Sequence, residues 1–337
     1  MMEAVAVRDA SAVAEVRRRA EAAAGRLGFP EEARSRAAIV ATELATNIVK
    51  YAEPGEVLIA PYEDDTGAGL EIVALDRGPG MADAGACLGD GYSTGGSAGT
   101  GLGAVQRQSQ VFDLYSGPGR GTVIVARLEA RPEARRAAPP APRWSGLAVP
   151  LAGEAVCGDA YCLRTHPEGG WTLVVADGLG HGPQAAEASG AAIHLFRDRE
   201  TDGPGDILSA VHAGLRHTRG GAVSVARYEA ERGILVFAGL GNVLAAVATP
   251  RGEIRRTLSH SGTAGHVARR IQEFEYPFPP GALLVMHSDG IASAWSLDPY
   301  PGLTAAHPSL IAAVLYRDFG RGRDDATVVV ARGGAAP

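Results

Sequence analysis

The chain has 337 residues, a length that favours two ordinary domains, because single hydrophobic cores rarely extend beyond about 250 to 300 residues. Hydrophobic residues make up 46% and charged residues 21%, which is typical of globular proteins and excludes a disordered chain. The net charge of −6, the scarcity of aromatic residues and the lack of a basic stripe argue against nucleic acid or anionic lipid as partners.

The cysteines and the hydrophobic pattern indicate where the protein resides. Cys87, Cys157 and Cys162 include no CxxC pair, which argues against a disulfide framework or a zinc site. The chain starts without an apolar leader, and no segment reaches the roughly eighteen apolar residues of a membrane span. We therefore expect a cytoplasmic protein without membrane association, of undefined oligomeric state.

A stretch rich in Pro, Ala and Arg, residues 131–143, predicts an extended linker, since Pro neither extends a helix nor joins a central strand. It separates a first domain at 1–130 from a second at 144–333. In the first domain the pattern predicts a short strand, helices at 11–27 and 31–51, strands at 56–62, 70–76, 111–116 and 122–128, and a short helix at about 102–110.

The second domain alternates differently. Apolar runs predict strands at 171–176, 222–230, 233–238, 243–249, 282–287 and 326–331. Helices are expected at 183–198, 206–217 and 308–319. Both domains are therefore predicted to mix helices and strands.

The predicted helix at 31–51 has two distinct faces. Glu43, Asn47 and Lys50 are spaced i, i+4 and i+7 and share one face. A separate apolar stripe comprises Val40, Leu44 and Ile48. A carboxylate can act as a general base and an amide oxygen suits Mg²⁺, so the polar face predicts a nucleotide site.

Three short motifs follow this helix in order. Asp76 precedes two glycines, Gly78 and Gly80, that allow a tight turn beside a ligand. A glycine-rich run then leads into a helix, where free backbone N–H groups favour phosphate; it comprises Gly99, Thr100, Gly101, Leu102 and Gly103. Gly121 and Thr122 open the last strand. Each motif is common alone, and the prediction rests on their order.

This order resembles the GHKL ATPase/kinase family, with its Bergerat-type α/β sandwich. Glu43 and Asn47 match the N box, Asp76, Gly78 and Gly80 the G1 box, and Gly99, Gly101 and Gly103 the G2 box. The resemblance implies that Asp76 binds the adenine amine beside Thr122, that Asn47 holds Mg²⁺ of Mg-ATP, and that Glu43 activates the attacking hydroxyl. The run from Asp90 to Thr94 is most similar to the RsbT-type switch kinases, which resemble anti-sigma-factor kinases.

Acidic residues next to Gly or Asp recur in the second domain. They are Asp159, Asp177, Asp289 and the pair Asp324 and Asp325, and three of these places adjoin a strongly apolar strand. Carboxylates gathered at strand ends repel one another unless cations lie between them. Oxygen ligands favour Mg²⁺ or Mn²⁺ over zinc. The pattern predicts a two-metal site that activates water against a phosphoryl group.

The segment 177–182, with the acidic positions around it, resembles the PPM family of metal-dependent phosphatases, in its SpoIIE-like branch and closest to the RsbX type. The resemblance implies a central β-sandwich flanked by helices. It implies that Asp177 bridges two Mn²⁺ or Mg²⁺ ions, that the Gly178 carbonyl contributes, and that Asp289, Asp324 and Asp159 are ligands, with Asp325 a neighbour. His181 is either the general acid or a support of its loop.

Together these resemblances imply a bifunctional partner-switching regulator. The first domain would phosphorylate a Ser or Thr of a STAS-type antagonist or stressosome-type protein, and the second would remove that phosphate. Two alternatives remain open. In one, the first domain only binds nucleotide and a partner, such as a sigma factor or a scaffold; in the other, the chain is a small-molecule ATPase or phosphohydrolase.

Overall fold

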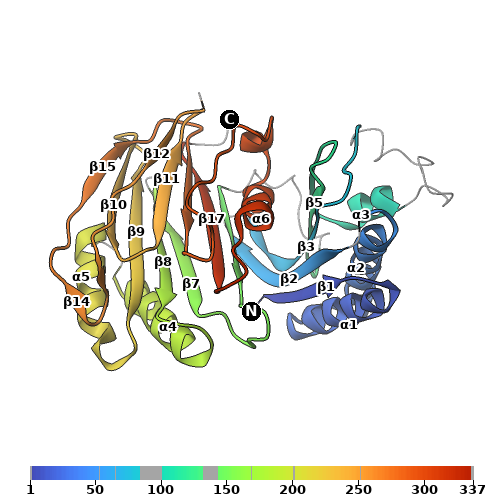
Figure 1. Ribbon diagram of the computed structural model, residues 1–337, viewed down its shortest axis with the longest axis horizontal. Helices are drawn as coiled ribbons and strands as arrows, with labels where there is room; N and C mark the ends of the chain where they lie inside the picture. Colours follow the sequence, from blue (N-terminus) through green and yellow to red (C-terminus); the bar gives the residue numbers. More distant parts are fainter. Residues whose placement is uncertain are drawn as a thin grey trace. The chain divides into compact units, whose positions relative to one another are not determined.

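The computed structural model describes residues 2–52, 54–64, 66–83, 101–131, 143–167, 169–199, 202–250 and 252–334. The chain forms two compact units, Met1–Pro142 and Arg143–Pro337 (Figure 1). In the described part of the chain, no helix combines the length and the apolar character needed to cross a membrane.

The first unit is an antiparallel sheet with two long helices on one face. Its elements are β1 (Glu3–Val7), α1 (Ala10–Arg26), α2 (Glu31–Tyr51), β2 (Gly55–Asp64), β3 (Gly67–Asp76), α3 (Gly101–Gln108), β4 (Val111–Ser116) and β5 (Thr122–Leu128). The strand order is β1-β2-β3-β5-β4. Alternate residues of β3, namely Leu70, Ile72 and Ala74, share one buried core with the two helices.

Local sequence sets the ends of the two long helices. Asp9 caps α1 by accepting a hydrogen bond from the Ser11 backbone N–H at 2.8 Å. Gly28 has a φ of 73° and ends the turn that separates the helices. Glu31 and Glu32 lie in the first turn of α2, where they complement the positive end of the helix dipole.

A charged cluster is buried on the opposite face of the same sheet. Glu71 and Arg127 are direct partners across β3 and β5, and Arg127 Nε donates to Glu71 Oε2 at 2.6 Å. Arg127 also pairs with Asp64 and lies 4.3 Å from the centre of the Tyr62 ring. Burial lowers the pKa of Arg127, but the charges of Glu71 and Asp64 outweigh it and raise that pKa overall. This arrangement fixes the pairing of the central strands.

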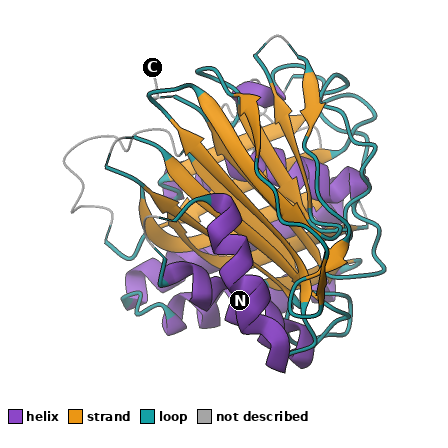
Figure 2. Cartoon of the chain, turned by 90° about the vertical axis from the view of Figure 1, so that its left-hand side faces the viewer, coloured by secondary structure: helices purple, strands orange, loops and turns teal. Residues whose placement is uncertain are grey.

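The second unit contains two five-stranded antiparallel sheets (Figure 2). The first, in the order β15-β10-β9-β8-β7, consists of β7 (Asp159–Thr165), β8 (Trp171–Gly178), β9 (Gly221–Glu229), β10 (Ile234–Leu240) and β15 (Phe274–Pro277). The second, in the order β12-β11-β16-β17-β6, consists of β6 (Trp144–Val149), β11 (Leu244–Ala248), β12 (Ile254–Arg256), β16 (Leu283–His287) and β17 (Ala326–Arg332).

Helices cover the outer faces of this sandwich. Its remaining elements are α4 (Pro183–Arg197), α5 (Pro204–Gly214), η3 (Leu215–His217), the ribbon β13 (Gly262–Thr263) and β14 (Val267–Ala268), η4 (Leu303–Ala305) and α6 (Pro308–Phe319). Trp171, Phe237 and Met286 belong to the core between the sheets. A second core joins α4 and α5 to the outer face of the first sheet, with Phe196 at its centre. Helix α6 contacts β17 and β6.

The fold class predicted from the sequence is confirmed. The predicted helix at 206–217 is divided into α5 and the short turn η3. The ribbon β13 and β14 was not predicted, and neither were the strands β6, β7, β12 and β15, which lie at the edges of the two five-stranded sheets.

Candidate nucleotide site and acidic cluster

Helix α2 brings two polar side chains to the start of α3. An added Cβ atom at Gly101 would lie 3.1 Å from Glu43 Oε2 and 3.8 Å from Asn47 Oδ1. Glu43 and Asn47 are half-buried one turn apart, and Lys50 is exposed at the end of the helix. Gly101 therefore keeps the space beside the carboxylate and the amide open.

The carboxylate of Asp76 is fixed by backbone groups. Its Oδ1 accepts hydrogen bonds from the N–H of Gly78 at 2.8 Å and from the N–H of Thr122 at 3.1 Å. Gly80 and Gly121 have φ values of 69° and 66°, and an added Cβ would lie 1.9 Å from Gly117 O and 2.1 Å from Asp76 O respectively. The two glycines thus allow the close backbone approach that orients Asp76.

Part of the predicted nucleotide site lies outside the described residues: Gly99, Thr100 and the run from Asp90 to Thr94. Gly103 is buried, and the side chain of Leu102 packs against the core. Because the side chain of Leu102 is used in this packing, its backbone N–H is the group that could contact a ligand. The Nδ2 atom of Asn47 is buried and has no hydrogen-bond partner within the described ranges. An unpaired N–H donor suits an acceptor such as a phosphate oxygen, whereas the Oδ1 atom of the same amide is the one that suits Mg²⁺.

The acidic cluster is assembled from both sheets of the second unit. Asp159 and Asp177 are direct partners across β7 and β8. Asp289 follows β16, Asp324 precedes β17, and these two strands pair with each other. Residues separated by 165 positions (324 − 159) are thereby collected at one place.

Burial and mutual repulsion raise the pKa values of these carboxyls. Burial, followed by the charges of Asp159, Asp289, Asp324 and Asp325, raises the pKa of Asp177 to about 8. Burial also raises the pKa of Asp159 to about 7, although the Ser288 and Thr327 hydroxyls oppose this. For Asp289, burial and the charge of Asp324 raise the pKa. These shifts favour protonated carboxyls in the bare cluster, whereas a divalent cation would favour the ionised forms.

The donor chemistry of the cluster fits hard divalent cations. Asp159 is 6% exposed, and its Oδ2 has no hydrogen-bond partner in the part of the chain that the structure describes. Among those same residues, no three His, Cys, Asp or Glu side chains already form a complete ligand group. A divalent cation between these carboxyls would offset their mutual repulsion.

Two residues hold the cluster in place through contacts that the sequence did not predict. Asp325 is 2% exposed, and its two oxygens accept hydrogen bonds from the backbone N–H groups of Leu151 and Gly158, both at 2.8 Å. This attaches the loop before Asp159 to the start of β17. Asn242 donates from Nδ2 to Asp289 Oδ2 at 2.6 Å. The only signal in the sequence was their position beside glycine-rich or acidic motifs.

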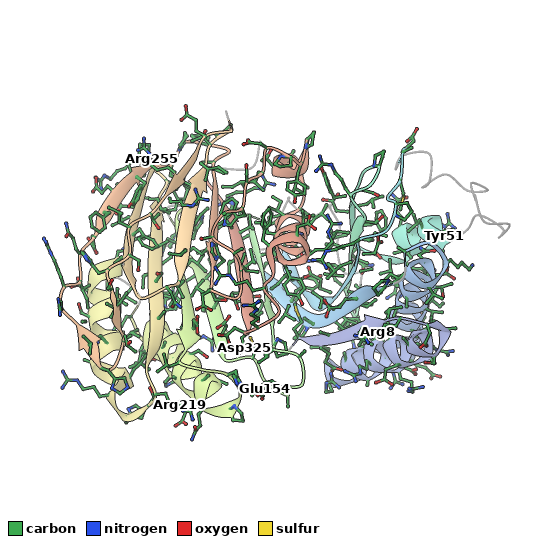
Figure 3. All side chains as sticks on the ribbon, viewed as in Figure 1. Arg8, Tyr51, Glu154, Arg219, Arg255 and Asp325 are labelled. Carbon is green, nitrogen blue, oxygen red and sulfur yellow. The ribbon has the colours of Figure 1, made fainter. Side chains whose placement is uncertain are left out.

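Gly178 ends β8, and His181 lies in the loop between β8 and α4. Gly178 packs closely, because an added Cβ would lie 2.0 Å from Ala185 O, and its N–H donates to Gly158 O at 3.2 Å. His181 Nδ1 lies 2.6 Å from Glu154 Oε1. Glu154 and Asp325 are both labelled in Figure 3. The structure thus places Gly178 at the end of β8, directly after Asp177, and His181 on the loop that follows.

Comparisons with known proteins agree with this two-unit arrangement. Residues 6–128 match the family described as histidine kinase-like ATPase domain, and residues 167–333 match stage II sporulation protein E (SpoIIE). The chain is 41% identical over 100 residues to the serine/threonine-protein kinase RsbT of Bacillus subtilis (strain 168), which covers 30% of this chain and 75% of RsbT.

Two further relatives match the second unit's family or its fold. The chain is 24% identical over 139 residues to the phosphoserine phosphatase RsbX of Bacillus subtilis (strain 168), covering 41% of this chain and 69% of RsbX. A solved structure described as "The bacterial stressosome: a modular system that has been adapted to control secondary messenger signaling" has 29% sequence identity and a TM-score of 0.52. That match covers 56% of this chain and 98% of the solved one.

Fold, site and matches together define the class: a kinase-like ATPase domain joined to a PPM-type phosphatase domain. In its first unit the chain belongs to the family of the RsbT switch kinases, and in its second unit it carries a SpoIIE domain homologous to RsbX. Both resemblances inferred from the sequence motifs are confirmed.

Proposed function

We propose that the chain is a bifunctional partner-switching regulator, which phosphorylates a Ser or Thr of a STAS-domain antagonist or stressosome-type protein and also removes that phosphate. The observation that carries the proposal is the presence of two chemically opposite sites in one chain. One gathers Glu43 and Asn47 at the start of α3, and the other gathers Asp159 and Asp177 at the end of a β-sandwich. A sigma factor or an anti-sigma system is a further candidate partner.

The first unit would bind Mg-ATP through the residues that its motifs indicate. Asp76 would recognise the adenine amine, with Thr122 beside it, and Asn47 would hold Mg²⁺. The backbone N–H groups from Gly101 to Gly103, together with Thr100 and Lys50, would approach the phosphates. ATP supplies the transferred phosphoryl group, and Glu43 accepts the proton of the attacking hydroxyl.

The second unit would hold two Mn²⁺ or Mg²⁺ ions through Asp159, Asp177, Asp289, Asp324 and the Gly178 carbonyl. Such ions activate water and neutralise the phosphoryl oxygens. The remaining work falls to protein groups. Asn242 orients Asp289, Asp325 anchors the loop before Asp159, and His181 donates a proton to the departing serine oxygen.

Radiolabelled ATP and candidate STAS proteins test the kinase. Glu43→Ala should reduce phosphoryl transfer by about a hundredfold or more, because removal of a general base costs that much. Glu32→Ala is the matched control, since Glu32 is exposed in the first turn of the same helix. If nucleotide binds but no partner is phosphorylated, the first unit is a binding module that serves a sigma factor or a scaffold.

Release of phosphate from a phosphoserine protein tests the phosphatase. The release should require Mn²⁺ or Mg²⁺ and should be abolished in Asp289→Ala, because one ligand of the cation pair is lost. Asp206→Ala, at an exposed position in α5, should retain activity. Full activity of Asp289→Ala would contradict the assignment of the metal ligands.

A further inference from the structure

His181 has a carboxylate partner that the mechanism above does not use. Its Nδ1 lies 2.6 Å from Glu154 Oε1, and the two residues are 27 positions apart in the chain. The side chain of His181 is 54% exposed and that of Glu154 is 27% exposed. The imidazole is therefore held on one side by Glu154 while it remains open to solvent, where a substrate could approach.

The position of Glu154 is fixed on two sides. Its N–H donates to Leu151 O at 2.9 Å, within a loop that Asp325 holds at both Leu151 and Gly158. On the other side its carboxylate lies against Gly182, where an added Cβ would lie 2.8 Å from Glu154 Oε2. Gly182 has a φ of 75° and carries no side chain that would displace the carboxylate. The loop and the glycine thus hold Glu154 against His181.

The same loops connect this pair to the acidic cluster. An added Cβ at Gly158, the residue before Asp159, would lie 3.4 Å from Gly180 O, the residue before His181. His181 therefore lies on a loop that packs beside a carboxylate of the cluster.

Hydrogen-bond chemistry then assigns the two nitrogens of His181. An ionised carboxylate only accepts hydrogen bonds, so Nδ1 must be the donor to Glu154. The Nε2 atom is left to exchange a proton with another group.

We propose that Glu154 is the positioning residue that makes His181 a general acid, and that the pair gives the site its preference for phosphoserine over esters with better leaving groups. This inference rests on the proposed phosphatase function. In the reaction, a water oxygen forms a bond to phosphorus while the bond from phosphorus to the serine oxygen breaks. The electron pair stays on the serine oxygen, which takes the proton from Nε2. The proton released by the water passes to solvent, and solvent returns one to the imidazole.

Two substrates with different leaving groups test the pair. A phosphoserine protein releases a basic alkoxide that needs a proton, whereas p-nitrophenyl phosphate releases a stable phenolate that does not. In Glu154→Ala the rate on phosphoserine should fall about ten- to a hundredfold, the usual effect of losing the carboxylate that orients a functional histidine. The rate on p-nitrophenyl phosphate should fall at least about tenfold less, because general-acid catalysis contributes little to that ester.

Further variants separate positioning from structural damage. His181→Ala should show the same selective loss, and Glu154→Ala/His181→Ala should be no slower than His181→Ala, because the two residues act as one unit. Glu154→Gln should recover part of the phosphoserine rate, since its amide oxygen still accepts a hydrogen bond. Glu187→Ala, exposed on α4, is the matched control and should resemble the unaltered protein on both substrates.

Each other outcome has a defined meaning. Parallel losses on both substrates in Glu154→Ala, additive losses in the double variant, or an unchanged phosphoserine rate would each overturn the inference. If the unaltered protein hydrolyses neither substrate with Mn²⁺ or Mg²⁺ present, the proposed phosphatase function fails instead. Melting curves of every variant, recorded in parallel, identify any that fail to fold.

Discussion

Asp177 is subject to opposing demands of stability and function. It is largely buried among other carboxylates, and its pKa is raised to about 8, so its ionised form is unfavourable in the metal-free protein. Asp177→Asn keeps the shape of the side chain and removes the ionisable group. We expect the metal-free variant to melt a few degrees higher than the unaltered protein, because relief of about 1 kcal/mol shifts the Tm by that amount.

Addition of Mn²⁺ should reverse this order. The unaltered protein should gain stability from the bound cation, whereas Asp177→Asn should gain little and should lack phosphatase activity. Calorimetry with a chelator and with Mn²⁺ measures both effects. A lower melting temperature of the metal-free variant would show that Asp177 is not under electrostatic strain.

At the same scale, the sequence indicated candidate ligands but not the residues that support them. The aspartates could be proposed because each adjoins a glycine or a second aspartate, a local signal; their roles stay predictions. Glu154, Asn242 and the anchoring role of Asp325 depend on partners 27, 47 and 167 or 174 positions away. Such contacts exist only after the sheets have paired, so no local pattern records them.

At the scale of elements, two glycines with the same backbone conformation should respond differently to alanine. Gly119 and Gly121 have φ values of 69° and 66°. An added Cβ meets nothing within 4 Å at Gly119, but lies 2.1 Å from Asp76 O at Gly121. Gly119→Ala should lower the free energy of unfolding only by the backbone strain, about 1 kcal/mol. This variant should retain ATP binding.

Gly121→Ala should lower the free energy of unfolding by clearly more than Gly119→Ala, because β5 must move away from the end of β3. This displacement removes the hydrogen bond from the Thr122 N–H to Asp76 and should weaken ATP binding by about tenfold or more. Chemical denaturation and nucleotide titration of both variants make the comparison. Equal affinities for ATP would show that Asp76 tolerates this movement.

Four of the strands that were not predicted share a position in the two five-stranded sheets. β6, β7, β12 and β15 each lie at the edge of a sheet, where one side lacks a neighbouring strand. The residues of β7 after Asp159 are only half-buried, whereas β8 beside it is buried almost throughout. A central strand must be apolar along its length and is therefore visible in the sequence, while an edge strand need not be.

For the whole molecule, the two proposed activities should be separable within one chain. Glu43→Ala should retain phosphate release within about twofold, and Asp289→Ala should retain phosphoryl transfer within the same factor, because substitutions without shared contacts act additively. Measuring both reactions in both variants checks this. Joint loss of the two activities in either variant would indicate that one site controls the other.

Helix α2 has a consequence for how the kinase-like unit can change over time. Leu44 and Ile48 are almost fully buried in the core, and each is the immediate chain neighbour of a site residue, Glu43 or Asn47. The helix has no glycine or proline between Glu31 and Tyr51 that could act as a hinge. A substitution that the core accepts therefore also moves Glu43 and Asn47. Changes in the core during evolution would then change the rate of phosphoryl transfer. This coupling gives an engineer a way to adjust the kinase without touching the nucleotide.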